Sequence, residues 1–203
     1  MFPFVKSLAW FLTTFCFRIK RSGAENIPQS GPVILVCNHL HMMDMMSILA
    51  QTRRRVFFMA KKELFKYKLF AWVLEKCGAF PIARGEVDVN GIRTAMKHLK
   101  DGDLLCIFPE GTRNKERKVL LLPLQDGVAM LALRCKAQIV PSWIEGGYSP
   151  WKRTRILTGK PMDLSDLEDV RKPTQMEMSA LTARIEQAMM DCREALLERD
   201  GIA

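Results

Sequence analysis

Residues 33–44 read Val-Ile-Leu-Val-Cys-Asn-His-Leu-His-Met-Met-Asp, an apolar run that passes directly into polar side chains. The five apolar residues follow Gly31-Pro32 and predict a short buried strand at 33–37. Ligands of open α/β sheets bind beyond the carboxyl ends of such strands. We therefore expect His39 and Asp44, which have four residues between them, to lie at the mouth of a crevice.

Strand-like and helix-like segments alternate along the rest of the chain. Apolar runs predict strands at 56–60, 79–83, 104–108, 139–144 and 155–158, and the second of these carries Pro81. Pro81 makes 79–83 an edge strand or a strand end, and we also expect 155–158 at an edge.

Helices are expected between these strands. Helical spacing and capping residues place them from Asp44 onward, over 64–77, from Asp88 or Asn90 to 100, over 128–135 after Asp126, and after the capping box Thr174-x-x-Glu177. Strands that alternate with helices predict a single α/β domain, with a largely parallel central sheet covered by helices on both faces.

Composition limits the class of protein and its partners. With 203 residues, 48% of them hydrophobic, the chain can bury one core without metals or disulfides. Its six cysteines are scattered singly, which favours buried thiols over a disulfide framework. The net charge of +9 indicates an anionic partner such as nucleic acid, a phospholipid surface or a phosphorylated small molecule. No recognisable nucleic-acid-binding module accompanies the basic clusters, so we expect no nucleic-acid partner.

The first 22 residues are rich in aromatic and aliphatic side chains. Lys6 and Arg18 bracket an uncharged stretch that is shorter than the roughly 20 residues of a membrane-spanning helix. Basic residues follow where a secretory signal would have a small-residue cleavage site. We expect residues 1–22 to form an amphipathic, membrane-associating helix ahead of a catalytic domain at 23–203. The alternative is a helix packed on the domain core.

His39 and Asp44 have the chemistry of a general base and its orienting acid. A neutral imidazole can accept a proton near neutral pH, and a carboxylate on its far nitrogen fixes the tautomer and stabilises the imidazolium. Because Asp44 begins a predicted helix, the helix N-terminus favours its ionised form. By itself, such a pair could also occur by chance.

A second polar segment, Phe108-Pro109-Glu110-Gly111-Thr112-Arg113, follows the buried strand at 104–108. Gly111 would let backbone N–H groups approach an anion, Glu110 could accept a substrate hydroxyl, and Arg113 offers a planar fork to a phosphate. Two shorter segments also end strands on distinctive residues, Gly78 to Arg84 and Ile139-Val140-Pro141. An ordinary turn with a surface arginine is the alternative for the 108–113 segment.

Taken in this order, these segments resemble the glycerolipid acyltransferase family, and most closely its bacterial-type 1-acylglycerol-3-phosphate (lysophosphatidic acid) acyltransferases, over roughly residues 31–146. The resemblance implies that His39 and Asp44 are catalytic. It implies a substrate-binding set of Asn38, His41, Arg84, Glu110, Gly111, Thr112, Arg113 and Pro141. The chain departs from the family in having His41 where Ser or Thr is usual and Asn114 in place of a frequent Ser.

The resemblance also implies a reaction. A fatty acyl group would move from acyl-CoA or acyl carrier protein to the free hydroxyl of a lysophospholipid, with 1-acylglycerol-3-phosphate giving phosphatidic acid in phospholipid biosynthesis. No cofactor or metal is expected beyond the thioester co-substrate. The chain lacks a Gly-x-Ser-x-Gly elbow, which favours direct attack over an acyl-enzyme. The expected location is the cytoplasmic face of the inner (plasma) membrane, as a peripheral or monotopic protein.

Four questions remain open at this point. The acceptor could be another lysophospholipid or a lyso-amino-acid lipid. Cys37, His39, His41 and Asp44 could instead hold zinc in a hydrolase, since thiolate, imidazole and carboxylate groups all bind this metal. The chain could also be a non-catalytic protein that binds anionic lipid. His41 could serve as the base or only line the site.

Overall fold

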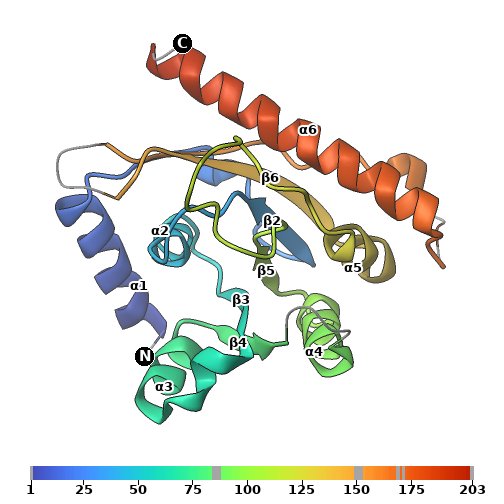
Figure 1. Cartoon of the computed structure of the whole chain (residues 1–203), viewed down its shortest axis with the longest axis horizontal. Coiled ribbons are helices and arrows are strands. Elements are labelled where there is room, and N and C mark those ends of the chain that lie inside the picture. The colour runs from blue at the N-terminus through green and yellow to red at the C-terminus, as the bar shows by residue number, and fades with distance from the viewer. Residues whose placement is uncertain (1, 84–87, 149–152, 168–169, 171, 202–203) are drawn as a thin grey trace.

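A seven-stranded sheet lies between two layers of helices in the computed structural model, which describes residues 2–83, 88–148, 153–167, 170 and 172–201 (Figure 1). The strands are β1 Lys20–Ser22, β2 Val33–Cys37, β3 Val56–Lys61, β4 Ala79–Ile82, β5 Leu104–Ile107, β6 Gln138–Glu145 and β7 Arg155–Thr158. Their order is β1-β7-β6-β2-β5-β3-β4, and every neighbouring pair is parallel except β6 with β7. The predicted α/β class and largely parallel sheet are confirmed.

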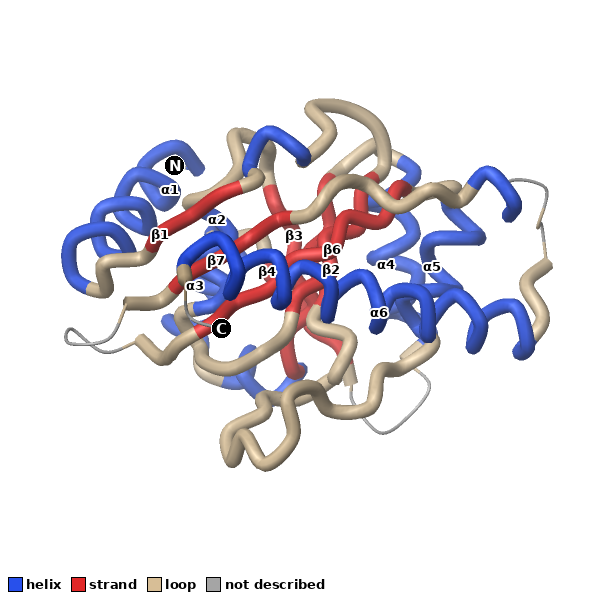
Figure 2. Tube along the Cα trace, turned by 90° about the horizontal axis from the view of Figure 1, so that it is seen from above, coloured by secondary structure: helices blue, strands red, loops and turns tan. Residues whose placement is uncertain are grey.

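The helices divide between the two faces of the sheet. They are α1 Phe2–Phe11, which continues as a π-helix at Leu12–Cys16, α2 Asp44–Leu49, α3 Lys68–Lys76, α4 Val89–Lys100, α5 Gly127–Cys135 and α6 Gln175–Asp200. Buried side chains of α1, α2 and α3 share one apolar cluster with the sheet, and those of α4, α5 and α6 share the other. Figure 2 shows α6 crossing over the strands, with α1 near one end of the sheet and α4 and α5 near the other.

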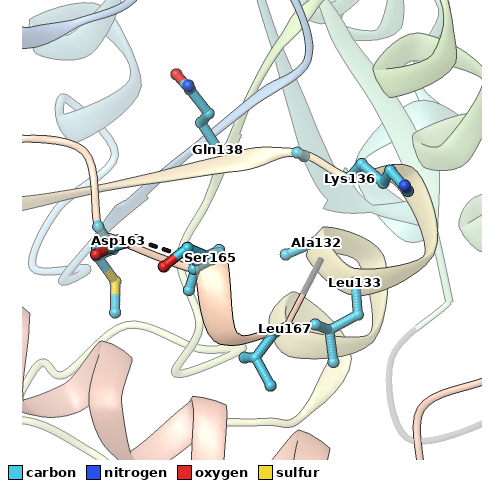
Figure 3. Close-up of a pocket in the computed structure, with 10 residues that line it drawn as sticks. Ala132, Leu133, Lys136, Gln138, Asp163, Ser165 and Leu167 are labelled. Carbon is cyan, nitrogen blue, oxygen red and sulfur yellow. Dashed lines mark hydrogen bonds between the residues drawn. The ribbon is translucent and has the colours of Figure 1, made fainter. Parts of the chain in front are cut away.

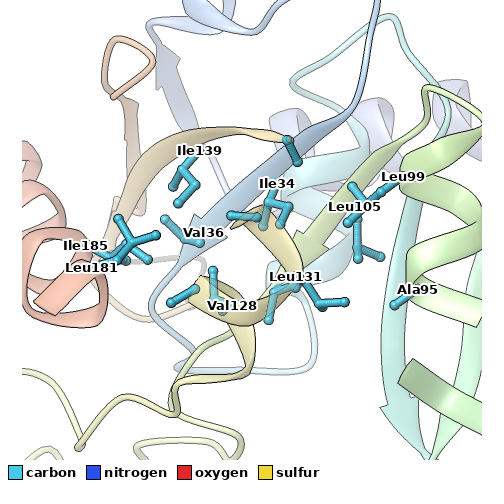
Figure 4. Packing of buried hydrophobic residues seen from close by; sticks show 14 of the residues in the cluster. Ile34, Val36, Ala95, Leu99, Leu105, Val128, Leu131, Ile139, Leu181 and Ile185 are labelled. Carbon is cyan, nitrogen blue, oxygen red and sulfur yellow. The ribbon is translucent and has the colours of Figure 1, made fainter. Parts of the chain in front are cut away.

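The alternation of side chains along β2 explains why five consecutive apolar residues are needed there. Ile34 and Val36 belong to the cluster under α4, α5 and α6, whereas Val33, Leu35 and Cys37 belong to the cluster under α1, α2 and α3. All five are fully buried. In Figure 4 the first of these clusters brings Ile34 and Val36 against α5 and against Leu181 and Ile185 of α6. A strand buried on both faces reads as a continuous apolar run.

Several local predictions are confirmed. β4 is an edge strand, as Pro81 indicated. The side chain of Asp88 caps α4 by accepting a hydrogen bond from the backbone N–H of Gly91 at 2.9 Å. Thr174 and Glu177 form the reciprocal capping box at the start of α6.

Two predictions at the sheet and at α5 are wrong. The segment 155–158 is not an edge strand, because the three-residue strand β1 pairs with its outer side. Asp126 precedes α5 but its side chain does not cap that helix. Its carboxylate instead accepts hydrogen bonds from Gln175 and Thr182, and so fastens α5 to α6.

The helix predicted over 64–77 also differs from expectation. A 3₁₀ turn at Lys62–Lys66 comes first, and the α-helix begins only at Lys68. Of the α3 side chains, Leu74 alone is fully buried. Much of the apolar spacing in this segment therefore points to solvent instead of to the core.

The N-terminal segment packs on the domain through one side and exposes the other. Ala9 of α1 lies in the apolar cluster beneath α2, while Trp10, Phe11 and Phe15 are 50%, 53% and 63% exposed. The chain then enters the sheet at Lys20, within the segment 1–22 that we expected to associate with a membrane. Among the residues that the structure describes, no helix has the length and apolar character needed to cross a bilayer.

Candidate active site

His39 and Asp44 meet at the carboxyl end of β2. The Nδ1 atom of His39 lies 2.8 Å from Oδ2 of Asp44. A carboxylate can only accept at this atom, so Nδ1 carries the proton and Nε2 of the neutral ring is the free acceptor. The pair expected from the sequence is therefore assembled, with the basic nitrogen facing away from the carboxylate.

Asp44 is the first residue of α2 and is fully buried. The same Oδ2 atom also accepts hydrogen bonds from the backbone N–H groups of Leu40 and His41, at 2.7 and 2.8 Å. The loop between His39 and the helix thus wraps around one carboxylate oxygen. Donation by backbone N–H groups stabilises the charged form of a carboxylate without introducing a cation.

The main chain of His39 is held by the loop that follows β5. Its N–H donates to Oε1 of Glu110 at 2.7 Å, and its carbonyl accepts from the N–H of Asn114 at 2.8 Å. Both backbone groups of the candidate base are therefore engaged by residues of the second polar segment or its immediate neighbour. These two hydrogen bonds place the polar segment that follows β2 beside the polar segment that follows β5.

Glu110 does not have the expected role of accepting a hydrogen bond from a substrate hydroxyl. It is 4% exposed, and its second oxygen accepts from the N–H of Leu122 at 3.0 Å. Burial raises the pKa of Glu110, and the hydrogen bonds from Leu122 and His39 oppose that rise. With both oxygens engaged by the backbone, Glu110 joins two loops and does not present an open carboxylate to a substrate hydroxyl.

Asn38 is a structural clamp. It is 1% exposed, its Nδ2 donates to the carbonyl of Ile144 at 2.9 Å, and its Oδ1 accepts from the N–H of the same residue at 2.7 Å. The side chain thus replaces a strand-to-strand backbone pair between the end of β2 and β6. Its place in the expected substrate-binding set does not fit this burial.

Two aromatic residues without a predicted role pack on the imidazoles. The ring of Phe108 stacks on His39 with centroids 4.1 Å apart, and the ring of Tyr148 stacks on His41 at 5.1 Å. Burial raises the pKa of Tyr148 well above its usual value, and the charge of Asp44 raises it further. Both residues follow strands, at the ends of β5 and β6, and this position is the signal that could have identified them.

His41 is exposed, and its role differs in geometry from that of His39. Its backbone N–H is bonded to Asp44, and its Nδ1 accepts from the N–H of Met43 at 3.2 Å.

Pro141 is buried within β6, where its carbonyl accepts from the N–H of Gly159 at 2.8 Å. It supports the sheet and does not line an open site.

The remaining predicted residues surround the 108–113 turn. Gly111 has φ +67°, a left-handed conformation that favours glycine, and a Cβ there would also require the end of the Gln125 side chain to move. Thr112 is exposed and Arg113 half-buried. The Arg113 guanidinium has no hydrogen-bond or ion-pair partner among the described residues. Arg84 lies outside the described residues.

An apolar cavity of about 310 Å³ adjoins the imidazole through Phe108. It extends between the ends of β3, β4 and β5 and the helices α4 and α5. Its lining comprises Met59, Ile82, Ala83, Asp88, Ile92, Ile107, Phe108, Pro109, Gly111, Gln125, Gly127, Val128, Met130 and Leu131. A mostly apolar cavity of this size beside a few polar side chains is typical of a small-molecule site.

Comparisons with known proteins identify the family of this chain. A sequence model of the acyltransferase family matches residues 18–145. The chain belongs to the acyltransferase family. A 1-acyl-sn-glycerol-3-phosphate acyltransferase of Bacillus subtilis (strain 168) is 29% identical over 184 residues, covering 88% of this chain and 89% of that protein. One from Streptococcus pneumoniae (strain ATCC BAA-255 / R6) is 33% identical over 154 residues, covering 72% of this chain and 56% of that protein.

A solved structure shares the fold of this acyltransferase. The crystal structure of the 1-acyl-sn-glycerophosphate acyltransferase from Thermotoga maritima superposes with a TM-score of 0.73 at 24% identity, covering 96% of this chain and 79% of that one. The family resemblance inferred from the polar segments is therefore confirmed, and the chain is an enzyme of the acyltransferase class.

The acyltransferase has a second hollow at the opposite end of β6. This cavity of about 470 Å³ lies beside Gln138, where β6 begins, and is lined by Lys136, Asp163, Ser165 and apolar side chains of α5 (Figure 3). The only polar contact drawn there is internal, from the N–H of Ser165 to Asp163 at 3.0 Å. Within the described ranges, no three His, Cys, Asp or Glu side chains are grouped as metal ligands would be.

Asn38→Ala should lower the free energy of unfolding by about 2 to 5 kcal/mol, because it leaves the buried N–H and carbonyl of Ile144 without partners. Denaturant unfolding measures the change. Asn26→Ala is the matched control, since Asn26 donates only one side-chain hydrogen bond, to the carbonyl of Thr158 at 2.9 Å, and its loss should cost less. Equal losses for the two variants would contradict the clamp.

Glu110→Gln should destabilise the enzyme by about 1 to 3 kcal/mol. One of the two accepting oxygens becomes an NH2 group, which cannot accept a hydrogen bond from the buried N–H that faces it. The variant should also lower kcat, because the backbone of His39 loses its contact with Glu110 and the imidazole moves. The acceptor KM should stay nearly unchanged. Steady-state kinetics and thermal unfolding together test this. A rise in acceptor KM with normal stability would instead support contact between Glu110 and the substrate.

Proposed function

We propose that this enzyme transfers a fatty acyl group from an acyl thioester, on coenzyme A or acyl carrier protein, to the free hydroxyl of 1-acylglycerol-3-phosphate, giving phosphatidic acid. The observation that carries the proposal is His39, whose Nδ1 is fixed by buried Asp44 and whose Nε2 has no hydrogen-bond partner among the residues that the structure describes. The names of the Bacillus subtilis and Streptococcus pneumoniae relatives support the choice of acceptor. Another lysophospholipid or a lyso-amino-acid lipid is the alternative acceptor.

The residues suit direct attack. Nε2 of His39 takes the proton from the acceptor hydroxyl as the oxygen attacks the thioester carbonyl, and the resulting imidazolium is stabilised by Asp44. When the tetrahedral intermediate collapses, the carbon–sulfur bond breaks and the imidazolium returns the proton to the departing thiolate. The products are the new ester and a free thiol. The proposed reaction assigns no step to a metal or another cofactor.

Arg113 is proposed to bind the acceptor phosphate. The guanidinium is half-buried and unpaired within the described part of the chain, and the next residue, Asn114, is hydrogen-bonded to His39. A planar fork matches two phosphate oxygens. Thr112 on the same turn is within the proposed subsite, and Arg84 is proposed as a second phosphate ligand from its sequence position alone.

The apolar cavity beside Phe108 is proposed to take a hydrocarbon chain. Its lining is mostly aliphatic, and Phe108 forms both part of the cavity wall and the ring that stacks on His39. A chain in this cavity would therefore end close to the base. Burial of apolar surface contributes about 25 cal/mol per Å², which favours binding of long acyl groups.

The enzyme is proposed to work as a peripheral or monotopic protein on the cytoplasmic face of the inner membrane. Trp10, Phe11 and Phe15 expose aromatic rings from one side of the N-terminal helical segment. Lys20 and Arg21 follow that segment closely. Aromatic side chains beside cations are typical of helices that lie in the interface of anionic membranes.

His39→Ala should lower kcat by at least about a hundredfold, the usual contribution of a general base. Thiol release from acyl-CoA on addition of 1-acylglycerol-3-phosphate, scored with the lipid product by mass, measures it. His41→Ala is the matched control and should retain most activity, because its Nδ1 already accepts from Met43. Substantial activity in the His39 variant, with loss in the His41 variant, would assign the base to His41.

Arg113→Gln should raise the acceptor KM by about 10- to 100-fold, the equivalent of a charge-assisted hydrogen bond. Lys115→Gln, at an exposed cation of the same loop, should change it little. A monoacylglycerol acceptor that lacks the phosphate should be used equally by wild type and the Arg113 variant. An unchanged KM for 1-acylglycerol-3-phosphate would place the phosphate elsewhere.

A further inference from the structure

The segment that includes α3 exposes a large apolar surface. We call this the α3 surface, and its members are Leu64, Tyr67, Leu69, Phe70, Trp72 and Val73, which are 41%, 74%, 78%, 36%, 50% and 42% exposed. Soluble proteins rarely expose apolar side chains in such a group unless the group contacts a partner. None of these residues belongs to the candidate active site.

The α3 helix is apolar on two sides. Leu74 points inward and packs in the cluster beneath the sheet. Leu69, Trp72 and Val73 stand at i, i+3 and i+4, so they share a different side. A helix that is hydrophobic on both sides is normally buried on both. The outward side of α3 therefore lacks its partner.

Lysines surround this surface and indicate what the partner is. Residues 61–76 contain five lysines against two glutamates. Lys66 and Lys68 flank the exposed ring of Tyr67 in sequence, and Lys76 Nζ lies 5.9 Å from the centre of the Trp72 ring. Lysine stems can cover apolar surface while their charged ends reach outward. Exposed aromatic rings among cations match the headgroup region of an anionic bilayer.

The position of α3 allows it to act with α1. Both helices cover the same face of the sheet as α2, whose first residue is Asp44 (Figure 1). The aromatic rings exposed by α1 are thus on the layer of the molecule that also carries the α3 surface. We propose that the α3 surface is a second membrane-binding element, which inserts its apolar side into an anionic phospholipid bilayer.

Vesicle binding tests the proposal. Sedimentation with vesicles of equimolar phosphatidylcholine and phosphatidylglycerol should show about a tenfold weaker partition for Leu69→Gln/Trp72→Gln than for wild type. Both side chains are exposed, so the melting temperature should not change. Met176→Gln is the matched control, because Met176 is 80% exposed on α6, which covers the opposite face. Equal partition of the double variant and this control would overturn the proposal.

A charge variant separates a bilayer from an acidic protein as the partner. Lys66→Gln/Lys68→Gln should bind the anionic vesicles more weakly and lose part of the salt dependence of binding. Purified acyl carrier protein is the comparison ligand for both variants. If carrier-protein binding falls while vesicle binding stays at the wild-type level, the surface binds an acidic protein and the lipid proposal is wrong. Vesicle binding requires no turnover, so its result is independent of the proposed reaction.

Discussion

The candidate site depends on the fixation of His39 at three points. Its N–H is bonded to Glu110, its carbonyl to Asn114 and its Nδ1 to Asp44. The first two partners come from the loop after β5 and the third from the start of α2. Catalysis by a base requires placement to a fraction of an ångström. A residue just beyond a strand gains that precision here because the neighbouring strand's loop holds its backbone.

This arrangement buries two carboxylates, and backbone donors offset part of the cost. Asp44 accepts from two backbone N–H groups and from the imidazole, and Glu110 accepts from two backbone N–H groups. Neither carboxylate pairs with a lysine or arginine in the described ranges. The charge of Asp44 is therefore not neutralised by a cation in the resting site. In the proposed mechanism, this charge stabilises the imidazolium that forms when His39 accepts a proton.

Much of this could be predicted from the sequence, for identifiable reasons. The strand at 33–37 could be predicted because its alternate side chains pack on opposite faces of the sheet. Both faces are buried, so no polar residue interrupts the apolar run. The contact of His39 with Asp44 is local and followed from spacing and residue chemistry. The clamp formed by Asn38 was not predictable, because its partner Ile144 lies 106 residues later. The same applies to Glu110, since the sequence does not tell whether a carboxylate faces substrate or buried N–H groups.

Short strands and exposed apolar residues show a second kind of limit. The three residues of β1 are too few for a detectable period, yet they place β7 inside the sheet. Helical spacing over 64–77 was real, but spacing alone does not reveal which side of a helix meets the core. Only the packing of Leu74 identifies the inward side of α3 and leaves Leu69 and Trp72 facing outward.

The two helical layers therefore do different work. The layer of α4, α5 and α6 completes the core, and side chains of α4 and α5 line the apolar cavity together with Phe108. The layer of α1, α2 and α3 carries Asp44 and the exposed aromatic side chains. An acceptor lipid has a charged headgroup at one end, which favours a polar environment, and an apolar chain at the other, which favours burial. In the proposed function, His39 would serve both ends as the base, because it lies where the exposed layer meets the cavity and a headgroup would not need to travel far from the membrane surface to reach it.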